Sequence, residues 1–421
     1  MNLVMLTKFY PYGTGEAFIE NEMNVLSQYY DRILVIACEA PDTSIIRSVP
    51  KNVTVRKVMG VDSRGKIADV VKGQLNYIKS SKEFRTESKN CRSLKQKGFL
   101  GYFEGKCQRV YREFRKENLL KDFVDAPFVL YSYWLFMTAR VATYILRDYK
   151  VSYIFTRAHR YDLYAEKNGT NYLPYRELFL NSFNKVFPCS INGERYLQEH
   201  YPEYKEKVRV ALLGTLDHGI GKPSTDGIFR VVSCSRIVAE KRIDRIAVAL
   251  ALLDNKGLNI KWTHIGGGTG LEAVKQKTEG LLTKIQFEFL GDTPNTKVME
   301  LYKEKPFDIF LNVSSSEGLP VSIMEAISFG MPVIATDVGG TSEITITGKT
   351  GLLLADEFKN EDLASAIEKL YHTKESEEYQ KYRVTCRAYW EQHFQAMVNY
   401  NELYSFIQKD KILSLIHISE P

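Results

Sequence analysis

The strongest chemical signal lies at positions 316–326, where the chain reads Ser-Glu-Gly-Leu-Pro-Val-Ser-Ile-Met-Glu-Ala. An apolar, strand-like run precedes this stretch, and a helical pattern begins at Val321. Gly318, Leu319 and Pro320 therefore form a turn that leads from a strand into a helix. The unpaired N–H groups and the dipole of a helix N-terminus bind anions such as phosphate. The turn predicts a phosphate site.

Two acids frame the same turn, and their positions suit hydroxyl groups. Glu317 stands at the end of the strand, where it is placed to accept hydrogen bonds from a sugar. Glu325 lies about one turn into the helix, where it is placed to accept from a ribose. Taken alone, both acids are equally well explained as stabilisers of the helix dipole.

Two cations follow an earlier strand-like run. Arg236 and Lys241 are five residues apart in Ser-Arg-Ile-Val-Ala-Glu-Lys. A guanidinium fork and an ammonium point charge at the end of a strand suit a diphosphate. In isolation, such a pair is more often a pair of solvated surface cations.

A glycine-rich turn, His264-Ile-Gly-Gly-Gly-Thr-Gly270, follows the next strand-like run. Its spacing is not that of a dinucleotide fingerprint, and no acid ends a strand about 20 residues later, so the dehydrogenase interpretation is weak. Gly267 at its centre lets the backbone come close to a ligand.

The first half offers two further candidates. The loop at 9–18 contains Gly13 and Gly15, whose lack of side chains lets the backbone approach a diphosphate, while Thr14 also suits a helix cap. His159 follows a strand-like run in Thr156-Arg-Ala-His-Arg-Tyr-Asp-Leu-Tyr164. A lone histidine is more often structural, but this one stands at the carboxyl end of a strand.

Apolar runs alternate with helical patterns along both halves, which is typical of parallel α/β architecture. The predicted strands are 2–6, 33–38, 53–58, 128–131, 152–155 and 185–190, then 229–235, 260–265, 285–290, 308–313, 332–336 and 351–354. Ligands of doubly wound sheets bind at the carboxyl ends of the strands, where the motifs above stand. We expect two Rossmann-like domains facing a cleft.

Length and composition fit this view. At 421 residues the chain exceeds one hydrophobic core, and 44% hydrophobic with 26% charged residues excludes disordered and collagen-like classes. The net charge of +6 is unevenly distributed along the chain. Segment 79–121 carries thirteen Lys and Arg against five Glu, a net +8 on a remainder of −2. With its aromatic residues, this basic segment favours contact with anionic headgroups, and a solvated pair of charged helices is the alternative.

The expected location is cytoplasmic. The six cysteines are scattered, without the spacing of a metal site or a disulfide framework, which favours a reducing compartment. The N-terminus lacks the pattern of a signal peptide, and no apolar run approaches the roughly 20 residues of a membrane-spanning helix. Segment 79–121 adds the expectation of peripheral contact at the inner face of the plasma membrane.

In this order and spacing, the motifs of the second half resemble the donor-binding domain of glycosyltransferase family 4, which contains retaining enzymes of the GT-B fold. The resemblance covers residues 229–371. It rests on Arg236 and Lys241, the turn at 265–268, Phe289-Leu-Gly291, Glu317 and Glu325, Gly339-Gly-Thr-Ser-Glu343 and Gly348-Lys-Thr-Gly-Leu-Leu353. The first half is similar to the acceptor domain of bacterial members that build surface polysaccharides, although the family more often has paired glycines where Gly13-Thr14-Gly15 stands.

The resemblance implies transfer of a sugar, with retention, from a nucleotide diphosphate sugar to a glycan or lipid-linked glycan. Arg236, Lys241 and the 318–321 turn would hold the diphosphate. Glu325 would bind the ribose and Glu317 the donor sugar, while His159 and the Gly13–Gly15 loop would come from the opposite domain. No cofactor is expected, and no metal, because no D-x-D pattern stands at a strand end.

The implied organisation is an acceptor-binding domain at 1–212 with the basic insert 79–121, a linker at 213–227 and a donor-binding domain at 228–388. A helix at 389–411 would cross back to the first domain. The tail at 412–421 breaks the helical pattern and resembles translated adaptor sequence. Two alternatives stay open: another nucleotide-sugar enzyme of this fold, such as an epimerase, and a basic nucleic-acid-binding protein, for which no recognition motif is found.

Overall fold

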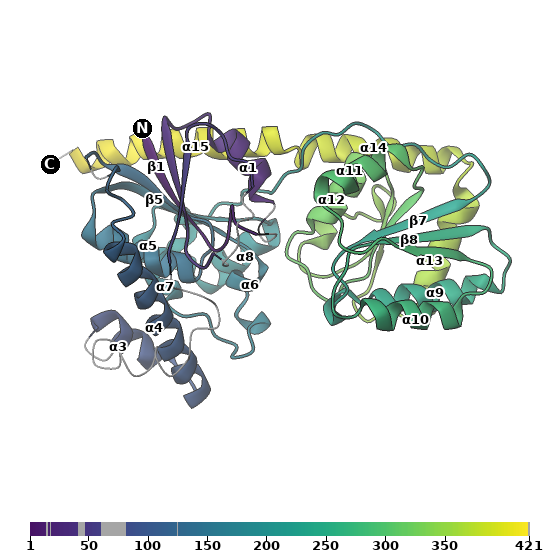
Figure 1. Ribbon diagram of the computed structural model, residues 1–421, viewed down its shortest axis with the longest axis horizontal. Coiled ribbons are helices and arrows are strands. Elements are labelled where there is room, and N and C mark those ends of the chain that lie inside the picture. The colour runs from purple at the N-terminus through teal and green to yellow at the C-terminus, as the bar shows by residue number, and fades with distance from the viewer. Residues whose placement is uncertain (14–15, 17, 41–46, 60–80, 124, 420–421) are drawn as a thin grey trace. The chain divides into compact units, whose positions relative to one another are not determined.

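The computed structural model describes residues 1–13, 16, 18–40, 47–59, 81–123 and 125–419, with residues 415–419 as backbone only. Gly15 therefore lies outside the described residues. Contacts group Met1–Leu212 with Tyr400–Pro421 as unit 1, and Leu213–Asn399 as unit 2 (Figure 1). Each unit is built on its own six-stranded sheet.

Unit 1 is a doubly wound sheet with strand order β3-β2-β1-β4-β5-β6, and its neighbouring strands run parallel. Its strands are β1 (Asn2–Thr7), β2 (Arg32–Ala37), β3 (Val53–Lys57), β4 (Phe128–Ser132), β5 (Val151–Ala158) and β6 (Lys185–Pro188). Its helices are α1 (Ile19–Leu26), α3 (Lys82–Asn90), α4 (Leu94–Lys116), α5 (Met137–Asp148), α6 (Arg160–Leu163), α7 (Arg176–Ser182) and α8 (Ile191–His200), with 3-10 turns η1 (Ala165–Lys167) and η2 (Pro202–Lys207).

Unit 2 repeats this topology with order β12-β11-β10-β7-β8-β9, again parallel. Its strands are β7 (Phe229–Cys234), β8 (Ile260–Ile265), β9 (Gln286–Phe289), β10 (Ile309–Asn312), β11 (Val333–Thr336) and β12 (Gly351–Leu354). Its helices are α9 (Ile243–Asp254), α10 (Leu271–Leu281), α11 (Asn295–Glu304), α12 (Val321–Ser328), α13 (Asn360–Thr373) and α14 (Glu377–His393), with 3-10 turns η3 (Ala239–Lys241) and η4 (Thr341–Glu343). The two doubly wound sheets are those predicted from the sequence.

The central strands are mostly apolar because helices cover both faces of each sheet. Every residue of β4, β10 and β11 is buried, for example. In unit 1, α1 lies on one side of the sheet and α5 and α7 on the other. In unit 2, α11, α12 and α14 lie on one side, and α9, α10 and α13 on the other (Figure 1).

The basic segment forms the helices α3 and α4, and α4 has one buried apolar side and one exposed charged side. The apolar side of α4 is part of the core of unit 1, where Leu100, Phe103, Val110 and Phe114 are buried. Most of its lysines and arginines are exposed. The expectation that the aromatic residues of this segment face a membrane is therefore not met at Phe103 and Phe114, because folding uses them in the core.

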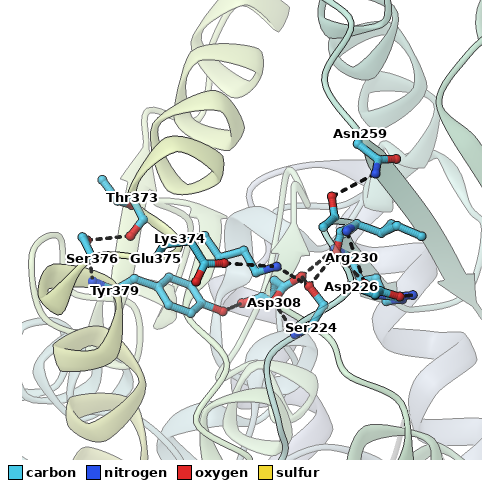
Figure 2. A network of polar contacts seen from close by, with 12 residues as sticks. Ser224, Asp226, Arg230, Asn259, Asp308, Thr373, Lys374, Glu375, Ser376 and Tyr379 are labelled. Atoms are coloured by element: carbon cyan, nitrogen blue, oxygen red, sulfur yellow. Dashed lines mark hydrogen bonds and ion pairs between the residues drawn. The ribbon is translucent and has the colours of Figure 1, made fainter.

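The stretch predicted as a linker, 213–227, packs on unit 2. Asp308, just before β10, binds it through both carboxylate oxygens, which accept from the backbone N–H of Ser224 at 2.9 Å and from its hydroxyl at 2.6 Å (Figure 2). Lys374 also donates to the Ser224 hydroxyl, at 2.5 Å. Buried polar groups are stable only when they are hydrogen-bonded, so this network holds the stretch in place.

The helix predicted at 389–411 is divided in two. α14 ends at His393, and α15 (Ala396–Ser419) starts three residues later. Thr215 pairs with the backbone at the break: its N–H donates to the carbonyl of Phe394 at 2.9 Å, and its carbonyl accepts from the N–H of Ala396 at 3.0 Å. From Tyr400 onward the chain belongs to unit 1. The helix continues to Ser419, so helical structure does not stop at 412 as the sequence pattern indicated.

Candidate functional site

The switch point of the unit 2 sheet lies between β7 and β10, which are neighbours in the sheet but not in sequence. In doubly wound sheets, ligands bind outside the carboxyl ends of the strands at this point. Arg236 comes two residues after the end of β7, and Glu317 comes five residues after the end of β10. The fold therefore places the two strongest motifs of the sequence at one edge of the sheet.

Lys241 and Glu317 form an ion pair at this edge. Nζ of Lys241 lies 2.6 Å from Oε1 of Glu317, and the side-chain amide of Asn312 donates to the same oxygen at 3.2 Å. Only 24% of the Lys241 side chain and 11% of that of Glu317 are exposed. In the free protein each side chain therefore holds the other at the end of the sheet.

Arg236 differs from Lys241 in having no such partner. Its side chain is exposed, and it forms no hydrogen bond or ion pair with any described residue. Its loop is nevertheless well anchored, since the N–H of Ile237 donates to the carbonyl of Gly267 at 2.7 Å. A fixed loop thus presents a free guanidinium.

The glycine-rich turn after β8 is the other half of this anchor. A Cβ on Gly266, whose φ is +132°, would lie 2.0 Å from the carbonyl oxygen of Ser235, so only glycine fits. The N–H of Gly267 donates to the carboxylate of Asp292 at 3.1 Å. The backbone of the glycine-rich turn therefore packs closely against the loop that contains Arg236.

The N-terminus of α12 stands beside Glu317 without a side-chain cap, and its first turn contains no acid. The loop after β11 fixes the turn before it. Gly340 donates its N–H to the carbonyl of Gly318 at 2.7 Å, and a Cβ on Gly339 would lie 2.1 Å from the carbonyl oxygen of Glu317. The first N–H groups of α12 are thereby held in place for an anion.

Glu325 lies in the second turn of α12 and is 8% exposed. Its Oε1 accepts a hydrogen bond from the side-chain amide of Asn295 at 2.8 Å. Burial raises the pKa of Glu325 to about 7, although the hydrogen bond from Asn295 acts in the opposite direction. A carboxylate held this way gains from further hydroxyl donors, such as those of a ribose.

Sequence reasoning missed Arg242, which positions several of these loops. Its guanidinium donates to the carbonyls of Val313 and Ser314, at 2.7 and 2.9 Å, and to that of Asp356 at 2.9 Å. It thereby ties the loop after β7 to the loops after β10 and β12. Arg242 itself has a positive φ of 49° and directly precedes α9. No local sequence pattern indicated this role of Arg242.

Unit 1 has its own switch point, between β1 and β4. Glu16, in the loop after β1, fills the position where an anion would bind the backbone. Its carboxylate accepts from the N–H groups of Lys8 at 3.2 Å, Phe9 at 2.6 Å and Tyr10 at 2.5 Å, and from the indole N–H of Trp134 after β4. Sequence reasoning missed both side chains, although it selected the loop with Gly13.

His159 follows β5 and lies in an aromatic cluster with Tyr133 and Trp134, at ring distances of 5.0 and 4.5 Å. Both of its ring nitrogens are buried and have no hydrogen-bond partner among the described residues. Burial, together with the charge of Arg157, holds its pKa well below the ordinary value. His159 is therefore neutral at pH 7, with one N–H donor and one nitrogen acceptor unused.

The charged neighbours of His159 have structural partners. Arg157 is completely buried and forms an ion pair with Glu22 at 3.1 Å. Asp162 accepts from the N–H groups of His159 at 2.6 Å and Leu135 at 2.7 Å, which joins the loops after β5 and β4. Both residues serve the fold of the loop rather than a ligand.

Two observations concern ions and membranes. Among the residues that the structure describes, no three or more His, Cys, Asp or Glu side chains gather closely enough to hold a metal ion. Within the same residues, none of the helices is both long and apolar enough to span a bilayer.

The comparison with known proteins covers the unit that contains this candidate site. Residues 221–385, all within that unit, match the family model "Glycosyl transferases group 1". This confirms the resemblance to glycosyltransferases, at the level of group 1 and over this part of the chain. The narrower assignment to glycosyltransferase family 4 stays a prediction.

Curated relatives match over part of their length. The chain is 30% identical over 155 residues to the O-antigen biosynthesis glycosyltransferase WbnH of Escherichia coli, covering 37% of this chain and 40% of that protein. It is 26% identical over 189 residues to the GtfA subunit of the UDP-N-acetylglucosamine–peptide N-acetylglucosaminyltransferase of Streptococcus parasanguinis, covering 44% and 36%. The chain thus spans about two fifths of the length of these relatives.

Solved structures match along nearly the whole chain. The lipopolysaccharide outer core galactosyltransferase WaaB superimposes with a TM-score of 0.67 at 13% identity, covering 97% of this chain and 100% of that one. Anabaena HepE, solved in complex with UDP, gives 0.66 at 16% identity with the same coverage. The fold is therefore the GT-B fold of glycosyltransferases, as predicted.

Proposed function

We propose that this protein is a retaining glycosyltransferase that moves a sugar from a nucleotide diphosphate sugar to a glycan or lipid-linked acceptor in surface-polysaccharide synthesis. One observation carries the proposal. The switch point of unit 2 gathers Arg236, the Lys241–Glu317 pair and the uncapped N-terminus of α12 at one sheet edge, inside a group 1 glycosyltransferase domain. The UDP complex of HepE and the UDP-sugar in the name of the GtfA enzyme support a nucleotide sugar as donor.

In the proposed reaction, the bond between the donor sugar and the diphosphate breaks, and an acceptor hydroxyl oxygen bonds to the same carbon on the same face. The leaving diphosphate takes the proton of that hydroxyl. Arg236, Lys241 and the first N–H groups of α12 stabilise the charge that develops on the diphosphate. Glu325 binds the ribose and Glu317 the donor sugar. Neutral His159 donates a hydrogen bond to the transferred sugar without adding a charge.

The chemistry of this site makes a metal ion unnecessary in the proposal. Two cationic side chains and a helix N-terminus supply the positive charge that a bound divalent cation supplies in other transferases. Transfer should therefore proceed at an undiminished rate after treatment with a chelator. Loss of activity with EDTA, restored by Mg²⁺ or Mn²⁺, would contradict metal independence while leaving the donor site in place.

The decisive test is release of the nucleoside diphosphate. The protein is incubated with a panel of uridine, guanosine and adenosine diphosphate sugars, with and without extracts of lipid-linked glycans, and the free nucleotide is measured. We expect release from one donor class, stimulated by acceptor, with the anomeric configuration of the donor kept in the product. Release that needs no acceptor and yields an isomerised sugar nucleotide favours the epimerase alternative, and silence on every donor rejects the proposal.

We also propose that the protein works in the cytoplasm, with α3 and α4 in peripheral contact with anionic lipid at the inner face of the plasma membrane. Because the aromatic side of α4 is buried, the contact rests on exposed cations such as Arg85 of α3, Lys97 of α4 and Lys121 shortly after α4, which form no ion pair with a described residue. Each cation near such a surface contributes about 1 kcal/mol.

A flotation experiment with phosphatidylserine-containing liposomes tests this contact. The triple variant Arg85→Gln, Lys97→Gln and Lys121→Gln should lose salt-reversible binding. The matched variant of three exposed cations in unit 2, Lys275→Gln, Lys369→Gln and Lys381→Gln, should keep it. Equal binding by both variants would show that the basic helices do not serve this purpose.

A further inference from the structure

A cavity separate from the candidate donor site lies wholly within unit 1. It is a cavity of about 950 Å³ whose walls come from α3, the start of α4, the segment around η1, the 171–177 stretch and α8. This volume is at the upper end of the range of small-molecule sites. None of the residues assigned above to the donor lines it.

The cavity contains a buried cation whose hydrogen-bonding capacity is incompletely used. Arg176, the first residue of α7, lines the cavity and is 5% exposed. Its Nη2 donates to the carbonyl of Asp162, but its Nη1 has no hydrogen-bond partner, and no described carboxylate forms an ion pair with it. A buried guanidinium nitrogen without a hydrogen-bond partner is costly, so an anionic group that reaches Nη1 is favoured.

Three carboxylates, those of Glu87, Glu166 and Glu177, also line the cavity, but none of the three forms a hydrogen bond or ion pair with Arg176. The hydroxyl of Tyr172 donates to Glu87, and that of Tyr196 donates to Glu166 at 3.3 Å. Lys89 and Arg92 add two further cations to the lining, both exposed. The part of the cavity near Arg176 therefore suits a negatively charged group.

The remaining lining suits a saccharide. Three tyrosine rings, Tyr172, Tyr196 and Tyr201, stand among side-chain amides and carboxylates. Aromatic faces cover the apolar C–H faces of a sugar, and amides and carboxylates exchange hydrogen bonds with its hydroxyls.

We infer that this cavity binds an anionic saccharide, with its carboxylate or phosphate group at Arg176. The inference deepens the proposed function, and it rests on that function only for the role of the ligand, which would be the charged part of the acceptor. One chain segment links the two places, because it contributes His159 to the aromatic cluster and Leu163, Ala165 and Glu166 to the cavity. Asp162 in this segment holds the backbone of His159 and is itself held by Arg176.

Calorimetric titration of the full chain tests the inference with four probes: methyl glucuronide, glucose 1-phosphate, methyl glucoside and inorganic phosphate. We expect at least one of the two charged sugars to bind at least tenfold more tightly than the neutral sugar and than inorganic phosphate, and Arg176→Gln to abolish this preference. Equal affinity of charged and neutral sugars, no binding of any probe, inorganic phosphate binding as tightly as the charged sugars, or an unchanged preference in Arg176→Gln would each overturn it.

A second pair of variants keeps the test valid if Arg176→Gln does not fold. Lys89→Glu changes a cavity residue and Lys82→Glu an exposed residue of the same helix that does not line the cavity. Only Lys89→Glu should weaken binding of the charged sugar, by about fivefold, and equal effects of the two variants would reject the site. Nucleotide release measured in parallel separates the proposals, because a silent donor assay with intact saccharide binding rejects the transferase but not the cavity.

Discussion

At the scale of single residues, Arg236 and Lys241 stand in opposite situations before any ligand arrives. Lys241 is paired with Glu317 and helps to hold the loops, whereas Arg236 is exposed and has no partner among the described residues. Removing Lys241 therefore mixes structural and functional effects, since it leaves Glu317 without its cation. Arg236 is the cleaner probe of the donor site.

Arg236→Ala should reduce kcat/KM for the donor by about 100-fold or more, which is the size of effect expected when one charge-stabilising donor is lost from a transition state. The melting temperature should stay within about 1 °C of the wild type, because no described contact is lost. Lys369→Ala, an exposed cation on α13, is the matched control. If both variants are equally active, Arg236 does not hold the diphosphate.

Glu325 makes stability and donor binding depend on pH in opposite directions. Its pKa is about 7 in the folded protein, above its ordinary value, so the protonated form favours folding and this advantage is lost as the pH rises through about 7. Glu325→Gln should therefore be more stable than the wild type at pH 8, by up to about 3 kcal/mol, and of similar stability at pH 4. Thermal unfolding at both pH values measures this difference.

Donor affinity should change the other way, because only the ionised carboxylate accepts from two ribose hydroxyls. In the wild type the KM of the donor should rise as the pH falls below about 7, and this rise should be absent in Glu325→Gln. The same pH profile in both proteins would show that another group controls donor binding.

At the scale of elements, the loop after β11 contacts the backbone of the turn that precedes α12, at Glu317 and Gly318, and so holds the N-terminus of this helix. Gly339→Ala would place a Cβ 2.1 Å from the carbonyl of Glu317, so this turn must shift. We expect a loss of about 1–3 kcal/mol of stability and a raised donor KM. Gly348→Ala is the control, since Gly348 also has a positive φ, of 81°, but a Cβ there meets nothing within 4 Å. A donor KM raised equally in both variants would refute the role of the contact.

At the scale of the whole molecule, the last helix completes the core of unit 1. Tyr400, Tyr404 and Ile407 of α15 are buried, and the hydroxyl of Tyr404 donates to Glu22 at 2.5 Å, the same carboxylate that pairs with buried Arg157. A chain ending at Asn399 would leave that ion pair without the tyrosine side chains that contact it.

Truncation after Asn399 should therefore unfold unit 1, seen as loss of hydrogen-exchange protection in β1 and β5, while unit 2 keeps its protection. Truncation after Ser414 should change neither unit, because the buried contacts of α15 named above lie before that residue. Full protection of β1 in the shorter chain would show that α15 is dispensable for folding.

The sequence by itself predicted the twelve strands and their parallel arrangement, because fully buried strands require continuous apolar runs and long crossovers, which are local patterns. The order of the strands within each sheet came from the structure. It also placed Arg236, Glu317 and His159 at strand ends, since the carboxyl end of a strand is a local position. The helix α11 and the break between α14 and α15 were not predicted.

Only the tertiary structure decided which side chains are partners. Glu16 and Trp134 are 118 residues apart, and Asn295 and Glu325 are 30 apart, yet each pair is joined by a hydrogen bond. The free Nη1 of Arg176 and the pairing of Lys241 with Glu317 depend in the same way on how loops from different strands pack. Periodicity reports which face of an element is buried, but partners across a sheet edge are set by the packing of several distant segments, which no local pattern records.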